Sequence, residues 1–222
     1  MPSRISLAER WKHLAEKSAS YYSDRIKSFG PNVRGVDWNS DASQTLRFEQ
    51  LTAVWPCPGD SLSILDFGCG YGALVDFLVK KGMKYKYTGF DISSDMLLEA
   101  RKRDHHADVT WVETLEELTK YDLVLASGIF NVRLDCPLPE WEGYVADTLD
   151  LFNELALRKF SFNLLTSYSD KDHMRDYLYY ASPEYWFGYC KKRYSKFVLL
   201  NHSYPLYEFT IHVKKESPGI IV

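Results

Sequence analysis

The sequence lacks the features that would place the protein in a membrane, in an oxidising compartment or on nucleic acid. Its 222 residues contain no apolar run that approaches a membrane span, and the N-terminus has no hydrophobic signal segment. The four cysteines show no CxxC spacing, which favours reduced thiols in a cytoplasmic protein. A net charge of −3 at pH 7 provides no basic field. We therefore expect neither DNA nor a membrane as a partner.

Internal repeats, low-complexity segments and the spacing of a metal site are also missing. Adjacent His105 and His106 would point to opposite faces of a strand and so make a poor metal pair. What remains is the composition of a globular protein, with 45% hydrophobic and 26% charged residues. A chain of this length has room for one α/β domain with a sizeable core.

The stretch from Ile64 to Gly72, ILDFGCGYG, combines a buried strand with a turn that has almost no side chains. Asp66 lies at the end of the strand, the glycines occupy alternate positions, and a helical pattern follows at once. Such a turn lets a ligand lie against bare backbone at the carboxyl end of a sheet, with a helix N-terminus facing any anionic group. Two classes of cofactor use this geometry, because Gly68 to Ala73 also fits the GxGxxA pattern of dinucleotide folds.

A second strand is predicted from Lys84 to Phe90, and it ends at Asp91. Asp91 follows the first glycine by about the 20 residues expected of an acid that binds ribose hydroxyls. Ser93 or Ser94 then begins a helix as its N-cap.

Further elements precede and follow this unit in a regular order. Helical spacing covers Ile5 to Tyr22, and a second helix begins at Asn39 or Ser40 and runs to about Trp55. The remaining strands are predicted at Val109 to Val112, Tyr121 to Ala126, Phe160 to Thr166, Phe197 to Tyr204 and Tyr207 to Lys214. The last two strands form a closing hairpin, whereas a dinucleotide domain would continue with parallel units.

From Ser61 to Lys214 the sequence resembles the class I S-adenosylmethionine (SAM) methyltransferases, in their bacterial small-molecule branch. The resemblance rests on DFGCGYG, on GFDIS with Asp91, and on the exit of the fourth strand at Ser127-Gly128. It implies an α/β, Rossmann-like sheet of seven strands in the order 3-2-1-4-5-7-6, with strand 7 antiparallel and helices on both faces. It also implies a helical lid over residues 1–60 and a methyltransferase domain over residues 61–222.

The same resemblance implies SAM as cofactor. In this family the acid of the glycine motif lies near the methionine end of the cofactor, Asp91 would bind both ribose hydroxyls, and Glu113 would meet the adenine amine or merely begin a helix. Arg47 would bind the carboxylate of the cofactor through two N–H groups or form an ion pair at the surface. The predicted cofactor residues are Asp66, Gly68, Cys69, Gly70, Asp91, Ile92, Glu113, Thr114, Leu115, Ser127, Gly128, Arg47 and Trp38.

The acceptor implied by the resemblance is a small molecule, with oxygen preferred over nitrogen. His173 and Asp37 are the candidate catalytic bases, because both lie in predicted loops. The predicted substrate residues are Tyr21, Tyr22, Asn131 and Tyr168.

Other functions stay open. A SAM-binding regulatory or scaffold protein would keep the same cofactor residues, and a protein or RNA could be the acceptor. The Asp-Pro-Pro-Tyr sequence used on nucleobase amines is missing after the fourth strand, which argues against DNA methylation. The aromatic segment from Tyr177 to Phe187 suits a core, an acceptor pocket or the surface of a homodimer.

Overall fold

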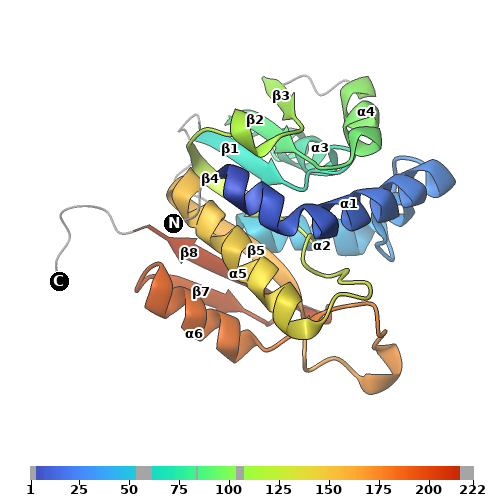
Figure 1. The fold of residues 1–222 in the computed structure, drawn as a ribbon. Coiled ribbons are helices and arrows are strands. Elements are labelled where there is room, and N and C mark those ends of the chain that lie inside the picture. Colours follow the sequence, from blue (N-terminus) through green and yellow to red (C-terminus); the bar gives the residue numbers. More distant parts are fainter. Residues whose placement is uncertain (1–3, 54–61, 84, 104–107, 216–222) are drawn as a thin grey trace.

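A twisted sheet with helices on both faces organises the chain (Figure 1). The computed structural model describes residues 4–53, 62–83, 85–103 and 108–215. The strands are β1 (Leu62–Phe67), β2 (Tyr85–Phe90), β3 (Val109–Val112), β4 (Tyr121–Ala126), β5 (Ala156–Thr166), β6 (Tyr180–Ala181), β7 (Val198–Asn201) and β8 (Glu208–Lys214). They pair in the order β3-β2-β1-β4-β5-β8-β7, and the two-residue β6 pairs with β5.

This order confirms the predicted fold. The short strand β6 shifts the numbering by one, so the predicted strands 6 and 7 correspond to β7 and β8. Strand β8 runs antiparallel to both β5 and β7, while β1 to β5 are parallel. Strand β5 begins four residues earlier than predicted, since the backbone passes from α5 into the strand at Ala156 without a loop.

Helices cover the sheet as its side-chain alternation requires. They are α1 (Arg4–Phe29), α2 (Asp41–Thr52), α3 (Ala73–Lys80), α4 (Ser94–Lys102), α5 (Leu138–Leu155) and α6 (Pro183–Arg193), with short 3-10 turns η1 (Val33–Val36), η2 (Leu115–Glu117) and η3 (Lys171–His173). In β1, Ile64 belongs to the apolar cluster that includes residues of α2 and α3, whereas Leu65 and Phe67 belong to the cluster that includes residues of α5 and α6. Both faces of β1 are therefore buried, as expected of a central parallel strand.

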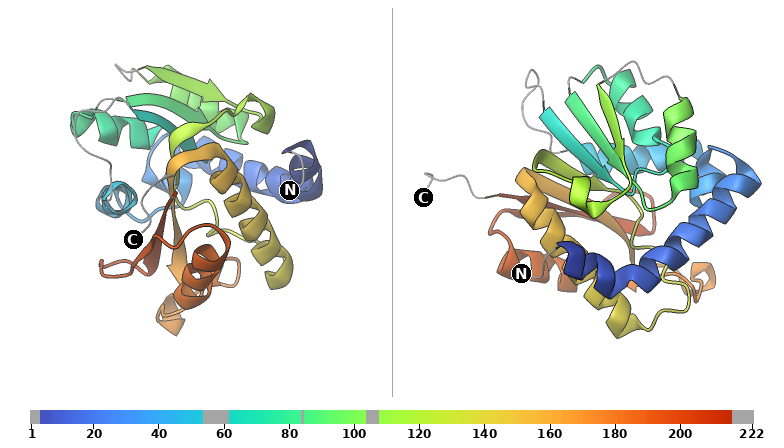
Figure 2. Two further views of the ribbon diagram at one scale, coloured as in Figure 1. Left: turned by 90° about the vertical axis from the view of Figure 1, so that its left-hand side faces the viewer. Right: turned by 45° about the horizontal axis from the view of Figure 1, so that its top comes forward.

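The N-terminal extension crosses the molecule as one long helix. Helix α1 lies beside α5 near its start and reaches α4 near its end (Figure 2). It continues past the predicted end at Tyr22 to Phe29, and Gly30 at φ +73° terminates it by donating to the carbonyl of Ile26. Among the described residues no helix is both long and apolar enough to cross a membrane. The predicted end of the second helix near Trp55, and the pair His105-His106, lie outside the described residues.

Candidate active site

A first cavity opens where β1, β2 and β4 end, at the carboxyl edge of the parallel sheet. It encloses about 850 Å³ of empty space, its opening to solvent included. The glycine turn after β1, Asp91 after β2 and Ser127-Gly128 after β4 form its floor. Tyr22, Trp38 and Phe48 from the N-terminal extension cover it.

The glycine turn is held by the neighbouring strand and has no room for a side chain at Gly68. The backbone N–H groups of Gly68 and Cys69 both donate to the carbonyl of Phe90, at 2.7 and 2.9 Å. Gly68 has φ +79°, and a Cβ there would lie 2.2 Å from Ile129 Cγ2. Gly70 has φ +54°, and its Cβ would point at Val36 and Met96, which also line the cavity. Glycine at both positions keeps the turn open to a ligand.

Asp91 is buried and braces the same turn. One carboxylate oxygen accepts from Gly70 N–H at 2.7 Å, and the other accepts from Ser93 N–H at 2.9 Å. Burial raises the pKa of Asp91 from 3.8 to about 6, although these backbone donors act in the opposite direction. The carboxylate keeps accepting capacity for ligand hydroxyls, because each of its oxygens has two lone pairs.

Asp66 is a second buried carboxylate in the first cavity. Its Oδ2 accepts from the Tyr87 hydroxyl at 2.5 Å. Burial, and to a smaller extent the charge of Asp91, raise the pKa of Asp66 to about 7, while the Tyr87 hydrogen bond lowers it. A positively charged ligand group placed beside Asp66 would favour the ionised form.

A second cavity adjoins the first across a shared wall of Tyr22, Val36, Trp38 and Gly128. It encloses about 1850 Å³, with its opening to solvent, and lies between the N-terminal extension and the loops that follow β4, β5 and β7. Polar and apolar side chains share its lining, and the polar ones include Asp37, Asn131, His173 and Arg175. The site therefore has two compartments at the carboxyl edge of the sheet.

Comparison with known proteins identifies this architecture. Residues 65–151 match the model of a family described as "Methyltransferase domain". The Mycobacterium tuberculosis protein named "Putative methyltransferase Rv1506c" is 50% identical over 159 residues, which cover 71% of this chain and 96% of that protein. The chain belongs to the class I SAM-dependent methyltransferases. SAM is accordingly its methyl donor.

More distant relatives agree at the level of domain and fold. A trans-aconitate 2-methyltransferase of Rhodopseudomonas palustris is 40% identical over 77 residues, 31% of this chain and 28% of that enzyme. The crystal structure of the Synechocystis magnesium protoporphyrin IX methyltransferase with bound S-adenosylhomocysteine (SAH) superposes with a TM-score of 0.64. It covers 93% of this chain and 100% of its own at 16% identity, so it shows a shared fold.

Most residues predicted to bind the cofactor line the first cavity of the methyltransferase. They are Asp66, Gly68, Cys69, Gly70, Asp91, Ile92, Ser127, Gly128 and Trp38. Tyr22, predicted to contact the substrate, lines both cavities. The glycine turn without side chains and the remaining hydrogen-bond acceptors of Asp91 fit an adenosyl cofactor. The part of the cofactor that each residue binds stays a prediction.

Five predicted residues line neither cavity. Glu113 and Thr114 are exposed, and their backbone N–H groups donate to the carboxylate of Glu117, the last residue of η2. Leu115 is the first residue of that turn and is half-buried. Tyr168 is 65% exposed, and its hydroxyl donates to Glu184. Tyr21 donates to Asp37 at 2.6 Å and so acts beside the second cavity rather than in it.

The candidate bases and Asn131 line the second cavity, and so does Arg47. Asp37 is already paired with Arg25 at 2.6 Å in addition to Tyr21, whereas His173 is exposed and packs on the ring of Tyr207.

Arg47 is 8% exposed, and its Nε and Nη2 bind Glu208. Of the two cavities it lines only the second. Its predicted role at the cofactor carboxylate stays a prediction.

Sequence reasoning missed several residues of the site. Gln44 of α2 bonds the Tyr71 hydroxyl in the first cavity at 3.0 Å, and Met96 and Tyr144 complete its apolar lining. Glu208 gave a readable signal, because it is the one acid within the apolar strand pattern EFTIHV.

Proposed function

We propose that this methyltransferase transfers the methyl group of SAM to an oxygen of a small molecule held in the second cavity. The observation that carries the proposal is the wall that the two cavities share at Trp38 and Gly128. A cofactor in the first cavity and an acceptor in the second would meet there, as an in-line displacement at the sulfonium methyl requires. Holding the two groups in a near-attack geometry can remove about 7–11 kcal/mol of barrier.

The cofactor supplies the electrophilic methyl group, and the chain supplies binding and orientation. Asp91 would accept hydrogen bonds from the ribose, and Asp66 would face the positively charged methionine end. The glycine turn would let the backbone approach the cofactor closely. Tyr22, Trp38 and Phe48, which cover the first cavity, would exclude water from it.

An acidic acceptor suits the charges of the second cavity. Among the described residues, the guanidinium of Arg175 bonds the backbone carbonyls of Asp172 and Met174 and forms no ion pair with a carboxylate. Its charge is thus available to a ligand, and His173 lies in the same lining. The relative from Rhodopseudomonas palustris is named for trans-aconitate, a carboxylic acid, which supports the same choice. A carboxylate needs no base, whereas a hydroxyl acceptor would use His173, with a gain of about 10²–10⁴-fold.

The test is methyl transfer from SAM carrying a deuterated methyl group to a panel of small carboxylic acids, phenols, alcohols and amines, followed by mass spectrometry. We expect a product with a labelled methyl ester, which mild alkali hydrolyses, and a raised KM for that acid in Arg175→Gln. The control is Arg158→Gln, which removes an exposed arginine that lines neither cavity. An alkali-stable N-methyl product would contradict oxygen transfer, and SAH binding without turnover on any acceptor would favour a regulatory SAM-binding protein.

A further inference from the structure

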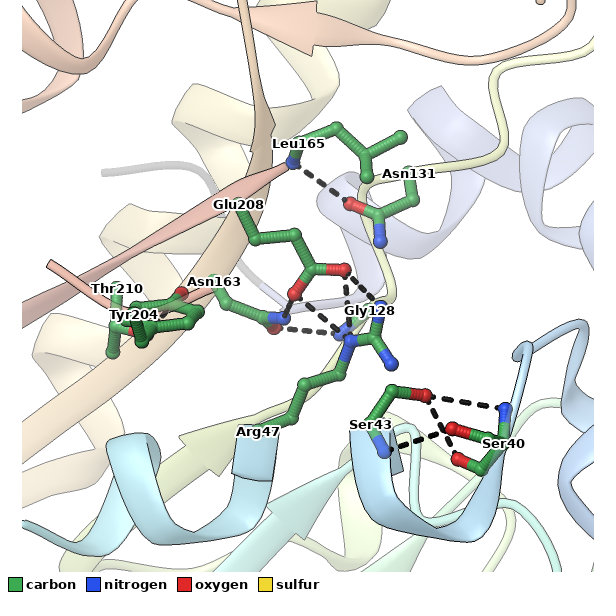
Figure 3. Close-up of polar contacts among 10 residues, drawn as sticks. All are labelled: Ser40, Ser43, Arg47, Gly128, Asn131, Asn163, Leu165, Tyr204, Glu208 and Thr210. Carbon is green, nitrogen blue, oxygen red and sulfur yellow. Dashed lines mark hydrogen bonds and ion pairs between the residues drawn. The ribbon is translucent and has the colours of Figure 1, made fainter. Parts of the chain in front are cut away.

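A chain of buried polar contacts connects α2 with the turn after β4 (Figure 3). Arg47 on α2 forks on Glu208 of β8: its Nε lies 2.8 and 2.9 Å from the two carboxylate oxygens, and Nη2 lies 2.5 Å from Oε1. Glu208 Oε2 also accepts from Nδ2 of Asn163 on β5 at 2.6 Å. Asn163 Oδ1 in turn accepts from the backbone N–H of Gly128 at 2.8 Å. Glu208 and Asn163 are each 1% exposed.

The donors and acceptors available in these side chains determine which group donates in each hydrogen bond of the series. A carboxylate only accepts hydrogen bonds, so Glu208 requires the NH₂ group of Asn163 to face it. The amide oxygen of Asn163 must then face Gly128, whose N–H it holds. Glu208 therefore sets the orientation of the Asn163 amide, and Arg47 sets the position of Glu208.

The two residues at the ends of this series of contacts, Arg47 and Gly128, lie at the wall between the two cavities. At one end, the guanidinium carbon of Arg47 lies 4.8 Å from the centre of the Trp38 ring. At the other end, Gly128 has φ +76°, and a Cβ on it would lie 3.3 Å from Trp38. Trp38 thus lies over the side of Gly128 on which a Cβ would stand, where the cavities meet, and one set of side chains reaches both residues.

Stability alone does not account for this arrangement. A buried ion pair is often no more stabilising than apolar residues of the same volume. Nη1 of Arg47 adds a cost, since it is buried without a hydrogen-bond partner among the described residues. The geometry of the wall is the property that depends on these contacts most directly.

We propose that Arg47, Glu208 and Asn163 are positioning residues. They hold Trp38 and Gly128 in fixed positions relative to each other at the wall where methyl transfer would take place. The proposal rests on the proposed function in one respect, which is that the acceptor occupies the second cavity. It predicts that ordering of α2 and binding of the cofactor are linked through Glu208, although Glu208 does not line the first cavity.

The test compares Glu208→Gln with wild type by two measurements that need no acceptor. The first is the Kd for SAH by calorimetry. The second is the ¹⁹F resonance of Trp38 in protein labelled with 5-fluorotryptophan, assigned with Trp38→Phe. A glutamine cannot satisfy the donors of both Arg47 and Asn163, so we expect SAH to bind about tenfold more weakly. The Trp38 resonance should shift or split, while those of the core residues Trp141 and Trp186 stay in place.

The matched control is Asp150→Asn, which removes another forked arginine–carboxylate pair, with Arg193, remote from both cavities. It should leave the SAH Kd and the Trp38 resonance unchanged. A folded Glu208→Gln with the wild-type Trp38 resonance and a Kd within about twofold of wild type would overturn the proposal, even if its melting temperature fell.

If Glu208→Gln does not fold, Arg47→Lys tests the proposal with the same two measurements, the Kd for SAH and the ¹⁹F resonance of Trp38. Lysine keeps the charge on α2 but loses the planar fork and its stacking on Trp38. Neither measurement involves methyl transfer, so failure to find an acceptor would affect the proposed function and leave this result intact.

Discussion

Asp66 and Asp91 are carboxylates that the fold buries side by side at the ends of β1 and β2. Burial raises the pKa of both, to about 7 and about 6. The protein without ligand therefore holds two acids that lose their protons close to neutral pH. We expect cofactor binding to depend on pH in a range where surface carboxylates do not titrate.

The affinity for SAH should fall as the pH is lowered from 7.5 to 5. The ionised form of Asp91 is the one that accepts hydrogen bonds from ribose hydroxyls, and protonation at about pH 6 removes it. One pH unit below that pKa about a tenth of the carboxyl is ionised, so this step alone raises the Kd by about tenfold. Calorimetry across this range measures the effect. Asp91→Asn should bind weakly and lose this step, keeping only the dependence that Asp66 contributes; an unchanged pH profile in that variant would contradict the assignment.

Asp66→Asn should stabilise the free protein and weaken its binding of SAH. The raised pKa of Asp66 means that the folded state holds its proton more tightly than the unfolded chain does. The stability that this proton contributes is complete below pH 3.8 and is lost as the pH rises to about 7. The advantage of the variant in free energy of unfolding should therefore grow from pH 4 to 7 and level off above, after a gain on the order of 4 kcal/mol. Urea unfolding at a series of pH values measures it, and a variant less stable than wild type at pH 8 would refute the prediction.

At the scale of the element, helix α2 supplies residues to both cavities. Its face carries Gln44 and Phe48 to the first cavity and Arg47 to the second. The helix begins with a reciprocal cap, in which Ser40 Oγ accepts from Ser43 N–H at 3.1 Å and Ser43 Oγ accepts from Ser40 N–H at 3.2 Å (Figure 3). The local order of the first turn is thus connected to the site.

Ser40→Ala should lower both the free energy of unfolding and the affinity for SAH. Loss of an N-cap costs about 1 kcal/mol, and here the first turn precedes the residues that cover the cofactor. Chemical denaturation and calorimetry give the two quantities. The matched control is Ser182→Ala, which removes the N-cap of α6, a helix that lines neither cavity. It should cost similar stability and leave the SAH Kd unchanged; an equal loss of affinity in both variants would mean that only global stability matters.

At the scale of the whole molecule, local patterns predicted the sheet but not the contacts that complete the site. Strand–turn–helix units and the closing hairpin specify the strand order, because parallel crossovers have one hand and neighbouring strands pair. Asp91 could be recognised because its spacing from the glycine turn follows from one such unit. The contact of Arg47 with Glu208 spans 161 residues and depends on how α2 lies on β8, which no periodicity in either segment encodes. The bond between Asp66 and Tyr87 joins neighbouring strands 21 residues apart, and it depends on their register, which the spacing of the motif does not specify.

The attachment of α1 also emerges only at this scale. Among the side chains of α1 that the structure describes, from Glu9 onward, the apolar residues Trp11, Leu14 and Ile26 are buried against the rest of the protein. The other contacts of α1 include exposed ion pairs, such as Lys17 with Asp135 and Lys27 with Asp95, and part-buried hydrogen bonds, such as Ser23 with Ser93. Exposed pairs contribute about 0–1 kcal/mol each. We propose that α1 acts as the predicted lid, because exposed ion pairs form part of its attachment to the rest of the protein.

Hydrogen exchange should show α1 opening without ligand and closing with it. Without SAH, we expect the amides of α1 to exchange faster than those of α5, since few buried side chains oppose local opening. SAH in the first cavity would contact Ser18 and Tyr22 of α1, so at about 100 times its Kd it should slow exchange there by as much as 100-fold. Helix α6 serves as the internal control and should not respond. Equal rates in α1 with and without saturating SAH would show that the helix is a fixed brace, and that the cofactor enters by another route.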